Sequence, residues 1–305
     1  MKVAPIRETT LRDYKQRLLR VLVLIQERLD GPLELEALAA RACLSPYHFH
    51  RVFTGLVGET LMAHIRRLRL ERAAGRLKLG RRPVIEIALE AGYETHEAFT
   101  RAFKASFGRS PSAFRARPGT GANLSARSGI HYREPRTLRN FKTSRHSSLA
   151  MNVTIKRLAP LRVAFLRHVG PYDQSGVTWE KFSTFLGKEG LLGGDSRFIG
   201  VCHDDPDVTP PDKIRYDACV SVDANFRPGG EIGAQVIAGG EYAVLTHHGP
   251  YAKLGESYHR LVGQWLPRSG REMAAAPCFE EYLNSPENTE PEDLITDLHL
   301  PLAAR

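Results

Sequence analysis

The most constraining feature of this 305-residue sequence is a short pattern that occurs twice, fifty residues apart. Residues 45–53 are Ser-Pro-Tyr-His-Phe-His-Arg-Val-Phe, and residues 95–103 are Thr-His-Glu-Ala-Phe-Thr-Arg-Ala-Phe. A glycine follows each copy at the same distance, at Gly58 and at Gly108. The shared positions of hydroxyl, aromatic, arginine and glycine residues predict that each segment forms the second helix of a helix-turn-helix.

Both copies carry the signals of a helix that starts after a tight turn. Ser45 and Thr95 are residue types that cap helix N-termini by accepting hydrogen bonds from otherwise unpaired amides. Gly92 suits the turn of the second copy because glycine adopts positive φ without strain. The first copy has Cys43 near that point, and its turn is one residue shorter. A short helix is expected before each of these segments, and the small residues at its packing positions would let the two helices cross closely. The packing positions are Leu38, Ala39 and Ala42 in the first copy and Ile87, Ala88 and Ala91 in the second.

The aromatic spacing separates a core face from an outer face on each second helix. Phe49 and Phe53, like Phe99 and Phe103, are four residues apart and fall on one side of a helix. The polar residues between them then face away from the core, where they can hydrogen-bond to base edges of DNA. The candidate DNA-contacting residues are Tyr47, His50, Arg51, His96, Glu97, Thr100 and Arg101.

Charge separates the chain into two halves and favours DNA binding over ordinary packing of amphipathic helices. Residues 1–150 contain 28 Lys and Arg against 13 Asp and Glu, a net charge of +15, whereas residues 151–305 have 15 against 21, a net charge of −6. A positive half suits neutralisation of phosphates, and an acidic half suits a domain that stays off DNA. One copy of the helix pattern would leave both interpretations open, but two copies in register within a basic segment indicate DNA binding.

Residues 8–118 resemble the AraC/XylS family of transcription regulators. The resemblance rests on both motifs, on the helix expected between them at residues 62–77, and on the closing segment Gly108-Arg-Ser-Pro-Ser-Ala-Phe-Arg. It implies an all-α double helix-turn-helix domain whose recognition helices enter successive major-groove segments, about 34 Å apart, on one face of promoter DNA. By position, the seven candidate residues match the DNA-contacting faces of those helices.

Residues 119–150 are rich in Arg, Ser, Gly and Asn and show no sustained period. This composition predicts a basic linker between two domains. Its basic residues, among them Arg127, Arg133, Arg136 and Arg139, could add nonspecific phosphate contacts, although a basic linker is more often simply solvated. Ile130–Tyr132 is a candidate for a short ordered element.

A second repeat organises residues 151–305. His168-Val-Gly-Pro-Tyr returns 79 residues later as His247-His-Gly-Pro-Tyr, and an amphipathic helix pattern carrying Trp179 or Tyr258 follows each copy. Alternating apolar residues before each Gly-Pro predict a strand, a turn and then a helix. Further β patterns occur at residues 218–222, 279–283 and 297–300. We therefore expect a multidomain chain whose second domain is α+β, with a duplicated strand-helix unit and an antiparallel sheet.

This half resembles the GyrI-like effector-binding domains, through the paired motifs and the ending Phe279-Glu-Glu-Tyr followed by Leu300-Pro-Leu. The resemblance implies an aromatic-lined cleft with a central acidic residue, receptive to cationic, greasy molecules by ion pairing and cation–π contact. Glu280 and Tyr282 share one face of a strand, so Glu280 is the candidate carboxylate, while Glu281 faces the other way. Most aromatic residues at such spacing are simply core. The candidate ring residues are Tyr172, Trp179, Tyr251, Tyr258, Trp265 and Tyr282.

Other motifs give little. The four cysteines are scattered, so we expect reduced thiols and no zinc site. His247 and His248 are adjacent on a strand and face opposite sides, which makes a poor chelate. There is no P-loop, no GxSxG and no HExxH, and we expect no cofactor. The best hydrophobic run, at residues 18–25, contains Arg20 and is too short to span a bilayer, so a soluble cytoplasmic protein without membrane partners is expected.

Three functional classes compete for this chain. In the first, a ligand-responsive transcription regulator, a small, cationic and amphipathic effector changes how the helical domain engages promoter DNA or RNA polymerase. In the second, the C-terminal half is a hydrolase-like enzyme in which a buried Glu beside Tyr282 acts as general base. In the third, that half docks a protein partner. Because both halves fit the first class, we predict a non-enzymatic regulator.

Overall fold

The computed structural model describes residues 8–117, 122–133, 138–143, 151–193 and 195–304. Residues 11–146 form one compact unit, the helical unit, and residues 147–305 together with the first ten form another, the effector unit. Several residues of the expected linker, including Gly119, Gly121 and Arg136, lie outside the described residues. Each unit is described by itself below.

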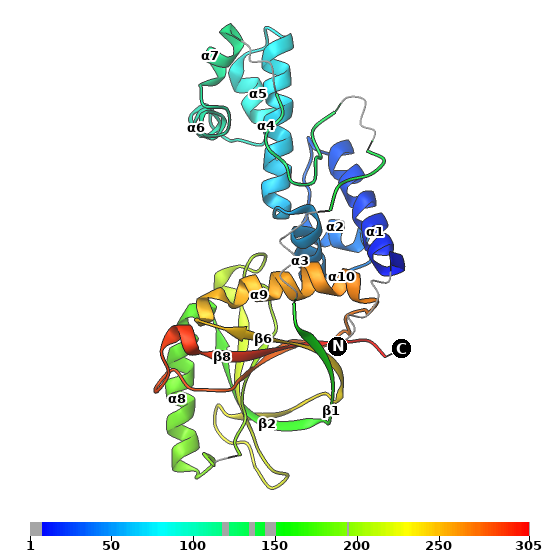
Figure 1. Cartoon of the computed structure of the whole chain (residues 1–305). Coiled ribbons are helices and arrows are strands. Elements are labelled where there is room, and N and C mark those ends of the chain that lie inside the picture. The colour runs from blue at the N-terminus through cyan, green and yellow to red at the C-terminus, as the bar shows by residue number, and fades with distance from the viewer. Residues whose placement is uncertain (1–7, 118–121, 134–137, 144–150, 194, 305) are drawn as a thin grey trace. The chain divides into compact units, whose positions relative to one another are not determined.

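The helical unit contains two helix-turn-helix pairs joined by one long helix, α4 (Figure 1). The first pair is α2 and α3, the second is α5 and α6, and α1 and α7 precede and follow them. The expected all-α double helix-turn-helix fold is confirmed. The helices are α1 (Glu8–Glu27), α2 (Leu35–Arg41), α3 (Pro46–Val57), α4 (Leu61–Leu79), α5 (Val84–Glu90), α6 (His96–Phe107) and α7 (Pro111–Ala116).

The predicted caps begin both recognition helices. Ser45 Oγ accepts a hydrogen bond from the amide of His48 at 3.3 Å, and Thr95 Oγ1 accepts one from the amide of Ala98 at 3.1 Å. In the second turn Gly92 has φ +81°, as its lack of a side chain allows, whereas in the shorter first turn Cys43 takes φ +55°. Cys43 is the one non-glycine residue with positive φ in the described part of the chain. The two turns therefore reach the same left-handed position with different residue types.

Aromatic packing holds each recognition helix to its half of the unit. Phe49 and Phe53 of α3 and Phe99 and Phe103 of α6 are fully buried, as their spacing predicts. The rings of Phe103 and Phe114 meet edge to face with their centroids 5.3 Å apart, so α7 closes the second core. Burial of one face leaves the opposite face of each helix for polar residues.

The effector unit is an eight-stranded antiparallel sheet, strongly curled, with helices on one face (Figure 1). The strand order is β1-β6-β8-β7-β3-β4-β2-β5. The predicted antiparallel α+β fold is confirmed. Its strands are β1 (Val153–Leu158), β2 (Leu161–Val169), β3 (Phe198–Cys202), β4 (Arg215–Ser221), β5 (Gly233–Ile237), β6 (Gly240–His248), β7 (Cys278–Tyr282) and β8 (Ile295–Pro301). Its helices are α8 (Ser175–Lys188), α9 (Leu254–Arg260), a π-helical turn (Leu261–Trp265) and α10 (Leu266–Ser269).

The sheet combines two copies of a four-strand repeat that exchange their first strands. Strands β1 to β4 come from the first copy and β5 to β8 from the second, yet β1 pairs with β6 and β5 pairs with β2. The copies meet at the centre of the sheet, where β3 pairs with β7. We call this β3–β7 pairing the seam.

The repeated histidines have a structural role in this fold. His168 Nδ1 lies 3.0 Å from Thr178 Oγ1, and His247 Nδ1 lies 2.8 Å from Ser257 Oγ at the equivalent position of the second copy. In both, Nε2 faces the carbonyl oxygen of the proline that follows the glycine, at 3.1 and 3.4 Å. Because a carbonyl only accepts, Nε2 donates to it and Nδ1 accepts from the hydroxyl. Each histidine therefore ties the Gly-Pro turn to the first turns of the following helix.

A cluster of polar side chains surrounds Asp217 of β4, which is fully buried. Its carboxylate accepts two hydrogen bonds from Arg167, at 2.7 and 2.9 Å, and others from His203 at 2.8 Å and Gln235 at 3.0 Å. Burial alone would raise the pKa of Asp217, but the bonds from His203 and Arg167 hold it at about 2. The ionised carboxylate thereby joins β4, β2 and β5.

Replacing Asp217 with Asn should lower the free energy of unfolding by about 1 to 3 kcal/mol at pH 7, because Arg167, His203 and Gln235 lose a buried, charged acceptor. The folded-state pKa lies below its ordinary value of 3.8, so the difference between wild type and variant should be complete above pH 3.8 and shrink as the pH falls toward 2. Urea unfolding at several pH values measures it. Asp212→Asn, on an exposed turn, should change little; equal effects of both substitutions would contradict the assignment.

Candidate effector site and DNA-reading helices

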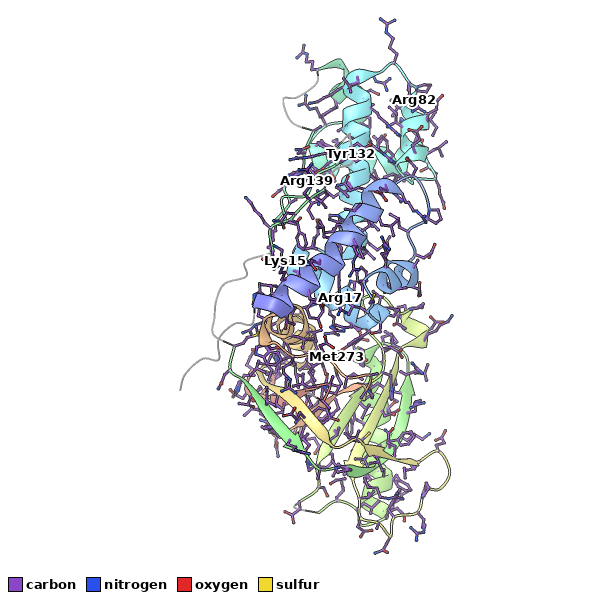
Figure 2. All side chains as sticks on the ribbon, turned by 90° about the vertical axis from the view of Figure 1, so that its right-hand side faces the viewer. Lys15, Arg17, Arg82, Tyr132, Arg139 and Met273 are labelled. Atoms are coloured by element: carbon purple, nitrogen blue, oxygen red, sulfur yellow. The ribbon has the colours of Figure 1, made fainter. Side chains whose placement is uncertain are left out.

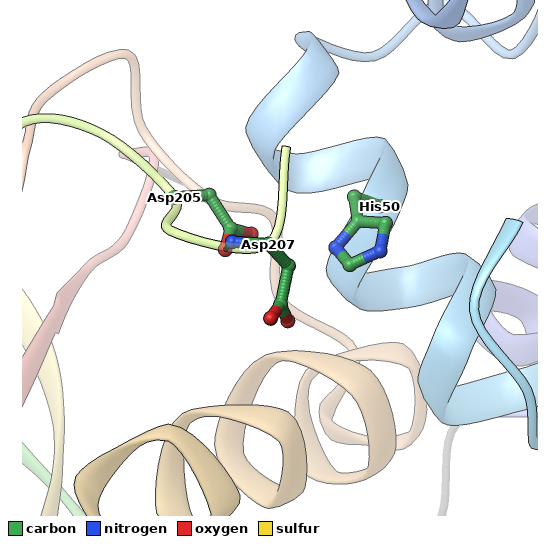
Figure 3. A group of neighbouring side chains, drawn as sticks. All are labelled: His50, Asp205 and Asp207. Carbon is green, nitrogen blue, oxygen red and sulfur yellow. Dashed lines mark hydrogen bonds between the residues drawn. The ribbon is translucent and has the colours of Figure 1, made fainter. Parts of the chain in front are cut away.

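The predicted DNA-contacting residues occupy equivalent positions on α3 and α6. Tyr47 and Arg51 are one turn apart on the side of α3 opposite Phe49 and Phe53, and the Arg51 guanidinium lies over the Tyr47 ring, 4.8 Å from its centroid. His50 also belongs to α3 (Figure 3), and the structure buries both His50 and Arg51, which the sequence predicted to face outward. This stacking gives α3 a combined aromatic and cationic group.

The corresponding side of α6 presents a different set of groups. Glu97 and Arg101 take the positions of Tyr47 and Arg51, and His96, Glu97 and Arg101 are exposed while Thr100 is half-buried. An acceptor beside a guanidinium differs chemically from the ring–guanidinium pair of α3. The two helices therefore offer different hydrogen-bonding groups to whatever they contact.

The effector unit has a buried carboxylate at the seam, on the face that carries α8 and α9. Glu280 lies on β7 and is 6% exposed. Its Oε2 accepts a hydrogen bond from the Tyr282 hydroxyl at 2.7 Å, and its Oε1 accepts one from Cys202 Sγ at 3.5 Å. Glu281 points to the opposite face, as predicted, and pairs there with Arg197 at 2.6 and 2.8 Å.

A chain of hydrogen bonds reaches this carboxylate from α8. Trp179 Nε1 donates to the Tyr216 hydroxyl at 2.9 Å, and the hydroxyls of Tyr216 and Tyr282 lie 2.8 Å apart. Because an indole only donates and Tyr282 gives its proton to Glu280, the middle bond must run from Tyr216 to Tyr282. All three bonds point the same way, so each polarises the next and stabilises negative charge on Glu280.

Residues of the second repeat approach the carboxylate from the other side. The Tyr258 hydroxyl of α9 donates to Cys202 Sγ at 3.9 Å, which links α9 to the thiol beside Glu280. The rings of Tyr251 and Tyr282 meet edge to face, 5.3 Å between centroids. The structure thus brings together six of the seven residues predicted for this site, which are Tyr172, Trp179, Tyr251, Tyr258, Glu280 and Tyr282. Trp265 lies further along, in the π-helical turn after α9.

Three residues of the site were absent from the sequence prediction. Tyr216 links two rings, Cys202 bonds to the carboxylate, and Gly200 faces Glu280 across the seam. A Cβ at Gly200 would lie 2.5 Å from the hydroxyl oxygens of both Tyr216 and Tyr282, so only glycine leaves room for their hydrogen bond. Their strands are short buried apolar runs, and the signal that unites them is strand pairing rather than any local pattern.

The electrostatics keep the surrounding donors protonated. Burial, reinforced by the negative charge of Glu280, raises the pKa of Tyr216 and Tyr282 well above the ordinary value of 10. The same two causes raise the pKa of Tyr251 and of the Cys202 thiol. A carboxylate surrounded by neutral rings and hydroxyls is chemically suited to accept an organic cation, because rings and charge attract it together.

A loop with three aspartates follows β3 next to this site. The Tyr172 hydroxyl donates to the carbonyl oxygen of Asp204 at 2.7 Å, and the Tyr172 ring lies 5.8 Å from that of Tyr216. Figure 3 shows Asp205 and Asp207 further along this loop. Tyr172 therefore connects the loop to the aromatic group around Glu280.

A separate hollow of about 580 Å³ lies between the start of β1, the end of β6 and α9. Its polar lining includes His248, Lys253, Glu256 and Arg260. It lacks the aromatic residues that surround Glu280, so its chemistry differs from that of the seam. The seam, where rings and a buried carboxylate converge, is the better candidate for recognition of an organic molecule.

Among the described residues, no helix combines the length and apolarity needed to cross a membrane. Two helix-turn-helix pairs in one chain with a sheet unit that carries a ligand-type site define a DNA-binding regulator with a small-molecule domain. Comparison with known families agrees: residues 38–117 match a helix-turn-helix domain of the AraC type, and residues 151–303 match the GyrI-like small molecule binding domain. The chain belongs to the AraC-type transcription regulators that carry a GyrI-like domain.

Similar proteins span one or both units. The right origin-binding protein of Escherichia coli (strain K12) is 34% identical over 266 residues, which cover 86% of this chain and 88% of that protein. The regulatory protein SoxS of Salmonella typhimurium is 34% identical over 105 residues, 34% of this chain and 98% of that protein. The solved C-terminal domain of EcmrR covers 52% of this chain and 100% of its own, with 19% identity and a TM-score of 0.43.

Substituting Gly200 with Ala should break the hydrogen bond between Tyr216 and Tyr282, because the new methyl group needs the space of both hydroxyls. We expect the free energy of unfolding to fall by about 1 to 3 kcal/mol, as for other overpacked cores. The fluorescence of Trp179, one of two tryptophans, should also change as its partner Tyr216 moves. Denaturant titration followed by emission spectra measures both effects.

Gly187→Ala in α8 is the matched control, since its new methyl group would meet nothing closer than 3.9 Å. Wild-type stability and emission in Gly200→Ala would show that the site tolerates a side chain there, contrary to this account.

Proposed function

We propose that the small molecule recognised by the effector unit is a lipophilic cation and that Glu280 accepts its charge. The observation that carries this proposal is the position of Glu280, 6% exposed among the rings of both repeats and bonded to neutral donors. An apolar cation brings the opposite charge and an apolar surface at once, so ion pairing, cation–π contact and burial act together.

We further propose that α3 and α6 both read promoter DNA. Tyr47, His50 and Arg51 act on the first helix, and His96, Glu97, Thr100 and Arg101 on the second. The equivalent placement of these residues opposite two aromatic cores supports the proposal, as does the positive charge of residues 1–150. Arg51 and Arg101 are suited to guanine, and Glu97 is suited to the amino group of cytosine.

Regulation then requires that the effector alter DNA binding or the engagement of RNA polymerase. A coupling free energy is reciprocal, so an effector that tightens DNA binding is itself bound more tightly in the presence of DNA. We propose binding rather than catalysis at Glu280, because the carboxylate already accepts hydrogen bonds from a tyrosine and a thiol.

Tetraphenylphosphonium and tetraphenylborate test the effector class, because they share one shape and carry opposite charges. We expect the phosphonium to bind saturably and the borate at least tenfold more weakly, measured by calorimetry. Glu280→Gln should weaken phosphonium binding tenfold or more, which corresponds to about 1.4 kcal/mol. Glu281→Gln is the control, since this neighbouring carboxylate points to the other face of the sheet.

Equal affinity of wild type and Glu280→Gln for the phosphonium would refute the role of Glu280. Binding of neither ion by the wild type would favour a protein partner over a small molecule. Rhodamine 6G, a lipophilic cation with an ester, tests the enzymatic alternative: the incubated dye should be recovered intact by mass spectrometry, and release of its free acid would indicate hydrolysis.

For DNA, Arg51→Ala and Arg101→Ala should each weaken binding to a selected promoter fragment by about 1 to 3 kcal/mol if each arginine reads a base. Arg157→Ala, which removes one exposed arginine from β1 of the effector unit, should leave affinity unchanged. Fluorescence anisotropy at fixed salt measures all four proteins. Undiminished affinity in one of the two variants would remove that helix from the reading surface.

A further inference from the structure

Part of the segment expected to be a linker lies against the middle of α4. Residues 122–133, which we call the strap, bind there to a single carboxylate, that of Glu71. Glu71 Oε1 accepts hydrogen bonds from the amide of Leu124 at 2.9 Å and from His131 Nδ1 at 3.0 Å, and its Oε2 accepts one from the amide of Tyr132 at 2.9 Å. Figure 2 shows Tyr132 beside α4.

Glu71 is only 2% exposed, and the guanidinium of Arg67 neutralises its charge. Arg67, one turn earlier on α4, donates to Glu71 at 3.0 Å and to the carbonyl oxygen of Ile130 at 2.9 Å. Arg67 also bonds to Glu59, at the turn between α3 and α4, at 3.1 Å. Because a buried carboxylate without these donors would be costly, Glu71 and the strap depend on each other.

The strap contacts both halves of the helical unit, the first with α1 to α3 and the second with α5 to α7. Leu124 packs against the core of the second half, which includes Phe99 and Phe103. At its other end, the carbonyl oxygen of His131 accepts a hydrogen bond from Gln26 of α1, in the first half, at 3.0 Å. The strap is therefore a second connection between the halves, beside α4 itself.

Arg72 adds a link in the same region of α4. Its guanidinium pairs with Asp30 of the first half at 2.5 Å and donates to the carbonyl oxygen of Glu90 in the second half at 2.6 Å. It also lies 5.9 Å from the centroid of the Tyr132 ring of the strap. Long helices tend to bend unless other contacts oppose the bending. A bend in the middle of α4 would change the distance between α3 and α6.

We propose that Glu71 is a positioning residue for DNA recognition, which holds the strap across both halves and so fixes the separation of the two recognition helices. This inference rests on the proposal that α3 and α6 both read DNA. The strap, which lies outside the residues that match the helix-turn-helix domain, would then contribute to specificity. The full chain would accept one spacing between the DNA segments contacted by α3 and α6 and reject others.

The test uses the full-length protein and a DNA fragment selected by it from a randomised duplex. Variants of that fragment gain or lose one base pair between the two protected segments. We expect wild type to bind these variants at least tenfold more weakly than the parent fragment. In Glu71→Gln the penalty should fall to threefold or less, because the halves can adjust to either spacing.

A merely structural role would weaken binding to all fragments equally and leave the ratio unchanged. Glu36→Gln, which removes the same charge from an exposed position on α2, should keep the wild-type ratio. Tyr132→Pro removes one amide donor to Glu71 without altering α4, so it replaces Glu71→Gln if that variant does not fold. A folded Glu71→Gln or Tyr132→Pro with the wild-type spacing penalty would overturn the proposal.

Arg101→Ala, assayed on the same fragments, separates this proposal from the one on which it rests. If wild type is indifferent to spacing, the positioning role is refuted. Loss of affinity in Arg101→Ala would then leave two-helix reading intact, whereas unchanged affinity would mean that α6 does not read DNA at all. Hydrogen exchange on the wild type gives an independent measure: the amides of Leu124 and Tyr132 should be protected, and rapid exchange of both would also refute the role.

Discussion

A buried carboxylate must gather donors from whatever surrounds it, and in both units of this protein one such group joins segments distant in sequence. Glu71 draws a backbone segment some sixty residues away onto α4, and Glu280 collects a tyrosine of its own strand and a cysteine of the strand across the seam. Desolvation makes an incomplete set of donors expensive, so the surroundings of each carboxylate are closely specified. The two carboxylates differ in the charge of their donors. The donors to Glu71 include an arginine, whereas the donors to Glu280 include a tyrosine hydroxyl and a thiol.

Local patterns predicted the parts of the structure that depend on neighbours in sequence. The caps at Ser45 and Thr95 and the aromatic spacing on α6 follow from helical geometry, and all are present. Alternation along β7 correctly separated Glu280 from Glu281. The repeated patterns predicted the two helix-turn-helix motifs and the strand-helix units, and the two resemblances supplied the family.

Contacts set by tertiary pairing were beyond that reasoning. Gly200 and Tyr216 belong to the site only because their strands pair next to β7. Glu71 belongs to an arginine-rich helix, and nothing local indicates that a later segment covers it. Cys43 takes a left-handed conformation that sequence reasoning assigns to glycine, because the shorter turn imposes it.

The exchange of first strands between the two repeats has a consequence for how the effector unit assembles. Strand β1 is the first strand to be synthesised, but it pairs with β6. Val153 therefore cannot form its strand pairing until Leu245, some ninety residues later, has been synthesised. Neither repeat can complete its half of the sheet alone, and closing such long loops is slow compared with helix formation. The helical unit precedes this sheet in the chain and therefore emerges earlier. The proposed ligand site should therefore be the last part of the molecule to become native, since its seam joins strands from both copies.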